Sequence, residues 1–109
     1  MQTEPLSLEA ELLKVLGHPV RLRVLQLLEQ EETCVCDLIR LTGVEQSNLS
    51  QHLKLLRKLG VVETRRDGTR VMYRLINPQV LAVLYAASQA VANHLERMVG
   101  MAAAHKGNR

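Results

Sequence analysis

Two cysteines separated by a single residue, Cys34 and Cys36, are the only thiols of this 109-residue chain. Sulfurs this close in sequence are poorly placed for a structural disulfide. Such a pair more often indicates metal or redox chemistry, because the thiolate is the form that binds soft ions and is oxidised. Two thiols are too few for a four-cysteine zinc site within one chain. Two small buried hydrophobic side chains are the alternative, and the spacing alone does not decide.

The residues around this pair predict a short helix, which runs from Cys34 to Gly43 and ends at the glycine. A thiol at the start of a helix faces the positive end of the helix dipole, which lowers its pKa. Positions i and i+2 of a regular helix diverge, so both sulfurs can hold one ion only if the first turn distorts. Ligand binding would then strain the helix, which is the basis of a switch.

Hydrogen-bonding side chains follow on a second short helix, predicted from Ser47 to Gly60, with a turn between the two helices. This order is the helix-turn-helix pattern, whose second helix lies in the major groove of DNA. Gln and Asn can bind adenine edges, and Ser reaches bases or phosphates. For His52, which adjoins Leu53, burial with a local hydrogen bond is an equal alternative. The predicted DNA contacts on this helix are Gln46, Ser47, Asn48, Ser50, Gln51, His52 and Lys54.

A basic β-hairpin is predicted next, because residues 61–65 and 69–75 alternate apolar and polar around an Asp-Gly pair. Residues 54–74 contain seven bases and two acids, which indicates a surface for a polyanion. The alternative is a solvated face, which is the usual role of a run of charged residues. A basic hairpin behind a helix-turn-helix is a wing, and Arg66 and Arg70 are its predicted DNA contacts.

Three further helices are predicted to frame this motif: one from Ser7 to Gly17, one beginning at Pro19, and one from Pro78 to about Gly100. The last has a heptad-like apolar seam that needs a partner surface. A chain this short also has limited surface to bury, so association with a second copy would stabilise its fold. We expect a homodimer formed through the terminal helices, and through the first helix as well. The predicted interface residues are Leu81, Leu84, Val91, Leu95 and Met98.

The predicted fold is therefore mainly α, a winged helix-turn-helix with a two-stranded β-wing. Its expected organisation is an N-terminal arm (1–6), a DNA-binding and dimerisation domain (7–100) and a flexible tail (101–109). Apolar residues make up 47% and charged residues 23%, a globular composition. No apolar run is long enough to cross a bilayer, and the first residues do not resemble a signal peptide. We expect a cytoplasmic protein without a membrane partner.

Together these residues resemble the ArsR/SmtB family of winged-helix metalloregulatory repressors, over about Leu12 to Leu95. The resemblance implies a homodimer that binds inverted-repeat operator DNA and leaves it when an ion binds. The CVCDL run is similar to branches of the family that use these cysteines for a soft metal or metalloid. The resemblance rests on four segments: LGHPVRL at 16–22, CVCDL at 34–38, residues 46–57, and residues 60–62 with the following hairpin to Leu75.

Departures from the family's patterns reduce the number of ions that the resemblance implies as inducer. Ile39 stands where some arsenic-sensing members carry a third cysteine, and the N-terminal arm lacks the cysteines of the cadmium and lead sensors. Asn77-Pro78-Gln79 stands where zinc sensors place their first ligands. The resemblance thus implies As(III) or Sb(III) at Cys34 and Cys36 as inducer, with no organic cofactor. A thiol-redox or persulfide response of the same pair is the alternative.

Two other classes of function are disfavoured by the sequence. A small thiol enzyme would need an oxyanion-cradling loop, a C-x-x-C motif or a histidine tied to the cysteines, and the sequence indicates none of these. A dimerisation adaptor that binds only protein would not need the basic hairpin. We therefore expect a DNA-binding repressor and not an enzyme.

Overall fold

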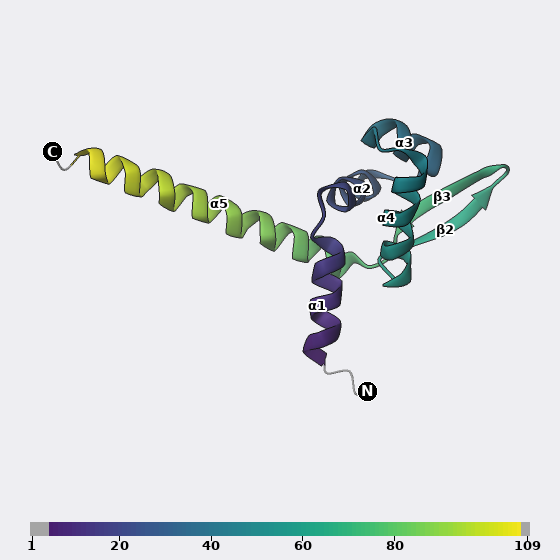
Figure 1. The fold of residues 1–109 in the computed structure, drawn as a ribbon, viewed down its shortest axis with the longest axis horizontal. Coiled ribbons are helices and arrows are strands. Elements are labelled where there is room, and N and C mark those ends of the chain that lie inside the picture. Colours follow the sequence, from purple (N-terminus) through teal and green to yellow (C-terminus); the bar gives the residue numbers. More distant parts are fainter. Residues whose placement is uncertain (1–4, 108–109) are drawn as a thin grey trace. The chain divides into compact units, whose positions relative to one another are not determined.

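The computed structural model describes residues 5–107 and divides at Asn77 into two compact units, which are considered separately. The second unit is one helix, α5 (Pro78–Gly107). The first unit contains the other elements, shown in Figure 1: α1 (Pro5–Leu16), α2 (Pro19–Gln30), β1 (Thr33–Cys34), α3 (Val35–Thr42), α4 (Gln46–Lys58), β2 (Val62–Asp67) and β3 (Arg70–Leu75).

The core of the first unit is aliphatic, as a chain without Phe or Trp requires. The apolar stripes of three helices meet there, and each stripe follows the three- and four-residue spacing of a helix face. Burying such side chains is the main favourable term in folding, at about 1.5–3 kcal/mol for each. The almost fully buried members are Val24 and Leu25 of α2, Leu38 of α3, Leu49, Leu53 and Leu56 of α4, and Val61 and Val62 at the start of the hairpin.

The helix-turn-helix is confirmed. Helix α3 ends at Gly43, whose φ of 71° is the left-handed conformation that glycine adopts without strain. Three residues then lead into α4 at Gln46. The start of α3 differs slightly from the sequence prediction. Cys34 is its N-cap, with extended backbone, and the helix proper begins at Val35.

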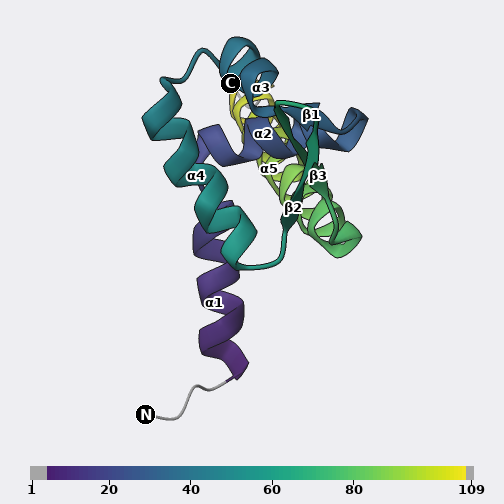
Figure 2. The same ribbon diagram turned by 90° about the vertical axis from the view of Figure 1, so that its right-hand side faces the viewer.

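The basic hairpin is also confirmed, and the sheet has one more strand than the sequence predicted. Strands β2 and β3 pair antiparallel around Gly68, whose φ is 65°. The two-residue strand β1 pairs with the other edge of β3, in the order β1-β3-β2 (Figure 2). A strand of two residues is too short to show alternation, so it left no periodic signal.

Two helices have different ends from those predicted. Helix α1 begins at Pro5 and not at Ser7, so the predicted arm is reduced to residues 1–4, which lie outside the described residues. Helix α5 extends to Gly107 and not to about Gly100. The run of Met and Ala after Gly100 favours helix strongly enough to continue through one glycine. Of the predicted tail, residues 108–109 lie outside the described residues. Within the described part of the chain, no helix is long and apolar enough to cross a membrane.

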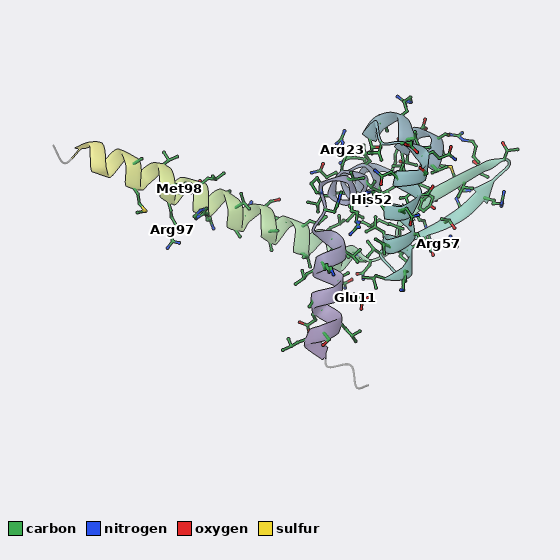
Figure 3. The ribbon with its side chains drawn as sticks, viewed as in Figure 1. Glu11, Arg23, His52, Arg57, Arg97 and Met98 are labelled. Carbon is green, nitrogen blue, oxygen red and sulfur yellow. The ribbon has the colours of Figure 1, made fainter. Side chains whose placement is uncertain are left out.

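A buried polar cluster joins α2 to α4 inside the first unit. The Arg21 Nε donates to His52 Nδ1 over 3.0 Å, and its Nη1 donates to the Val15 carbonyl over 2.9 Å. The rings of His18 and His52 lie 4.4 Å apart between centroids. His52 is only 8% exposed and lies between α2 and α4 (Figure 3). Because Nδ1 accepts a hydrogen bond, the His52 ring is held in its neutral form.

We expect this cluster to make folding sensitive to acid. Burial, followed by the nearby His18 and Arg21, lowers the pKa of His52 below its ordinary value of 6.5. The unfolded chain therefore binds more protons than the folded one as the pH falls below about 6.5, and the free energy of unfolding falls with it. His52→Asn keeps an acceptor near Nδ1 but cannot titrate. In urea denaturation between pH 5 and 8, the wild type should lose more stability than this variant; equal pH slopes would contradict the assignment.

Candidate thiol site and nucleic-acid interface

The thiol site forms where β1 passes into α3. The sulfurs of Cys34 and Cys36 and a carboxylate oxygen of Asp37 lie within 4.8 Å of one another. Cys34 is extended and precedes the helix, so the two sulfurs do not follow the divergence of helical positions i and i+2. The distortion of the first turn that the sequence suggested is therefore unnecessary. Cys34 is 1% exposed and Cys36 is exposed, so a solute can reach the pair from the Cys36 side.

The two thiols differ in acidity. The thiol of Cys36 lowers the pKa of Cys34, and so do the Arg70 guanidinium and the Asp37 backbone N–H, against the opposing effect of burial. The Cys34 sulfur in turn raises the pKa of Cys36, together with burial and the charge of Asp37. Cys34 is thus the more acidic thiol of the pair. The Cys34 sulfur also caps α3 by accepting from the Asp37 N–H over 3.3 Å.

Arg70, predicted from sequence as a DNA contact, lies at the thiol site. Its Nη2 donates to the Cys34 sulfur over 3.3 Å and lies 3.8 Å from Asp37 Oδ2. The sheet register explains this contact. Cys34 pairs with Met72 across β1 and β3, so Arg70 is a diagonal neighbour on the same face of the sheet. Arg66 pairs with Val71 and therefore faces the opposite side of the ribbon.

The predicted DNA contacts on α4 divide into two groups. His52 is buried in the cluster with Arg21 and does not belong to the exposed face. Ser47 lies beside Glu45, to which its hydroxyl donates a hydrogen bond. The other predicted positions are exposed, as a surface that contacts a groove requires: Gln46, Ser47, Asn48, Ser50, Gln51 and Lys54.

Ion pairs within the protein occupy three of the basic side chains between residues 54 and 74. Arg65 pairs with Glu32, Arg74 with Glu63, and Arg70 with Asp37. Among the described residues, the bases of this segment that form no ion pair are Lys54, Arg57, Lys58 and Arg66. Lys54, Arg57 and Lys58 line one surface hollow of α4, and Figure 3 shows Arg57 near the end of this helix. Sequence reasoning named Lys54 but missed Arg57 and Lys58, which the basic run 54–58 could have indicated.

Apolar side chains remain exposed on both terminal helices of the single chain. On α5, Val91, Leu95 and Met98 are 58%, 54% and 54% exposed, and Leu81 and Leu84 are partly exposed. Figure 3 shows Met98 projecting from α5. Leu6, Leu8 and Leu13 of α1 are also more than half exposed. Contiguous exposed apolar residues of this kind mark an interaction surface.

Comparison with known proteins agrees with this arrangement. Residues 18–64 match the model of the family described as "Bacterial regulatory protein, arsR family". The chain is 41% identical over 103 residues to the uncharacterized HTH-type transcriptional regulator Rv0081 of Mycobacterium tuberculosis, covering 93% of this chain and 90% of that one. It is 36% identical over 104 residues to the HTH-type transcriptional repressor SmtB of the same organism, covering 95% and 66%.

Solved structures show the same fold. The crystal structure of Rv0081 matches with a TM-score of 0.80 and 41% identity, over 89% of this chain and 99% of that one. A homodimeric winged helix-turn-helix DNA-binding domain from Mycobacterium bovis, a possible ArsR-family regulator, matches with a TM-score of 0.70 and 38% identity, over 88% and 93%.

Proposed function

The chain belongs to the ArsR family of transcriptional repressors, and we propose that As(III) or Sb(III) held by Cys34 and Cys36 releases it from its operator DNA. It is a DNA-binding homodimer and not an enzyme. The observation that carries the proposal is the pair of cysteine sulfurs, with a carboxylate beside it, at the start of the helix-turn-helix.

The donor set supports a soft ion. Thiolate sulfur favours soft ions, and the lowered pKa of Cys34 favours its thiolate form. Cys36 must give up its proton for the second bond to form, so binding weakens as the pH falls. Trivalent arsenic favours three sulfur ligands, and this chain supplies two. We propose that a small thiol or an oxygen ligand completes the site, and Asp37 lies within reach as an oxygen donor.

A redox response of the same pair is the second candidate. The lowered pKa of the Cys34 thiol favours it, because the thiolate is the form that an oxidant or persulfide attacks. The exposed Cys36 is placed to condense with an oxidised Cys34. In both candidates the same cysteine pair is the sensor and the same form of the protein binds DNA. They differ only in whether the releasing signal is an oxidant or persulfide, or a metalloid ion.

For the DNA-bound form, we propose that the exposed face of α4 lies in the major groove and that Arg66 contacts the backbone from the wing. Lys54, Arg57 and Lys58 are free of internal ion pairs and supply further phosphate contacts. Two-fold symmetry then requires an inverted-repeat operator, with half-sites one or more helical turns apart.

Variants of α4 and the wing test the DNA interface. Gln51→Ala should weaken specific binding by about 1–3 kcal/mol, since it removes a reader of base edges, and leave nonspecific binding nearly unchanged. Arg66→Ala should weaken both and reduce the salt slope by about one. Arg65→Ala is the matched control, because it removes an equal charge from the same strand but on the face that pairs with Glu32. Anisotropy titrations of operator DNA at several salt concentrations measure all three, and equal losses for Arg65→Ala and Arg66→Ala would contradict the proposed orientation of the wing.

The apolar seam of α5 is proposed as the dimer interface. Val91→Glu places a charge in the contact and should give a monomer in sedimentation at micromolar concentration. Because Val91 is 58% exposed in the single chain, the substitution should not disturb folding of the monomer. Asn93→Glu, at an exposed position two residues further along α5, should remain dimeric. A Val91→Glu protein that stays dimeric would place the interface elsewhere.

The inducer is tested by release of the operator complex under full reduction. Arsenite should weaken operator binding of the wild type by about five- to 150-fold, the range of ordinary allosteric coupling. Cys34→Ser and Cys36→Ser should bind the operator yet ignore arsenite. Serine at position 34 retains an acceptor for the Asp37 N–H, so the start of α3 is kept.

A parallel titration without metalloid separates the redox candidate. Release by an oxidant or a persulfide donor alone, with no release by arsenite under reduction, would assign the pair to redox sensing. An unchanged arsenite response in the Cys34→Ser/Cys36→Ser double variant would move the sensory site away from both cysteines.

A further inference from the structure

Arg70 connects the wing to the thiol site. The residue follows directly on the turn at Gly68 and Thr69, at the start of β3. Its guanidinium reaches the sulfur of Cys34 in β1. One side chain thus joins the hairpin turn to the residue that caps α3.

The Cys34 sulfur depends on the protein for its hydrogen bonds. Cys34 is 1% exposed, so water has little access to the sulfur and the protein must supply the donors. Two donors contact it, the Asp37 N–H and the Arg70 guanidinium, each over 3.3 Å. Of these, only Arg70 carries a positive charge, and only Arg70 comes from a distant segment of the chain.

The guanidinium depends on the sulfur in return. Its second partner, Asp37, lies 3.8 Å away, and the side chains of Arg70 and Asp37 are 54% and 41% exposed. Asp37 also pairs with Arg40 of its own helix. An exposed, shared ion pair of this length contributes little by itself. Loss of the sulfur as a hydrogen-bond acceptor would therefore leave the wing tip held to α3 mainly by a weak contact.

We propose that Arg70 is a positioning residue that latches the wing to Cys34, so that a ligand which takes this sulfur releases the wing. The proposal rests on the proposed function in treating Cys34 as a ligand of the inducer. When the sulfur donates an electron pair to a bound ion, the ion occupies a position around the sulfur and the sulfur no longer accepts a hydrogen bond from the guanidinium. Arg66, across the turn and on the opposite face of the ribbon, then loses the fixed position from which it contacts DNA.

The latch is tested first without DNA or inducer, in the full-length dimer. The variants are Arg70→Gln, which removes the charge, Arg70→Lys, which keeps it, and the control Arg66→Gln on the same ribbon. In Arg70→Gln, amide hydrogen exchange of residues 66–71 should lose protection, because the wing loses its contact with the Cys34 sulfur. Arg70→Lys should restore this protection at least in part, and Arg66→Gln should match the wild type. Wild-type exchange in Arg70→Gln would overturn the proposal.

The second arm occupies the sulfur with Hg²⁺, a probe that binds thiol pairs whatever the natural inducer is. In the wild type, Hg²⁺ should raise amide exchange of residues 66–71 to the level of Arg70→Gln, and it should add nothing in that variant. Stoichiometric Hg²⁺ binding, shown by loss of titratable thiols, with unchanged wing exchange in the wild type would overturn the latch. A wing released by Hg²⁺ but not by arsenite would support the latch and defeat the metalloid proposal, so the two failures are distinguishable.

Discussion

The pairing of a two-residue strand, Thr33–Cys34, with β3 fixes the geometry on which the site depends. It brings Cys34 opposite Met72 and so places the sulfur beside a side chain from the wing. The same pairing holds Cys34 in an extended conformation at the point where α3 begins. This one backbone register therefore decides where α3 begins and which groups surround the Cys34 sulfur. It also decides where the hairpin contacts the start of α3.

The basic side chains of the hairpin differ in whether they form ion pairs within the protein. On one face of the hairpin, Arg65, Arg70 and Arg74 are neutralised by partners within the protein. Arg66 on the other face keeps its charge unpaired, as do the bases near the end of α4. A polyanion is therefore met by fewer free charges than the composition suggests, and these are on the exposed face of α4 and on one side of the wing. In the proposed DNA complex, affinity depends on the orientation of the hairpin, which we propose Arg70 sets at its tip.

A hydrogen bond between a charged arginine and a neutral histidine ring supports the helix-turn-helix. The His52 ring accepts from Arg21, which also donates to the end of α1, so α4 is tied to α2 by a buried polar contact and by its leucines. The hydrogen bond from Arg21 requires an unprotonated His52 ring, and its geometry favours one position of α4 relative to α2. The exposed apolar residues of α1 and α5 face a different requirement, because a single chain leaves them in water. The proposed homodimer would remove that cost.

The sequence by itself determined the features that depend on neighbouring residues. The leucine spacing, Gly43, Pro19 and the Asp-Gly turn are local signals, and the helix-turn-helix and hairpin appear where they predict. The cysteine pair and the polar face of α4 were equally visible. The tertiary structure decided what depends on residues far apart in the chain. Strand β1 exists only because β3 passes beside it, and His52 is buried only because Arg21 and His18 close over it. Arg70 and Arg66 look alike in sequence, but the sheet register turns one toward the Cys34 sulfur and the other toward solvent, since side chains alternate strictly across a strand.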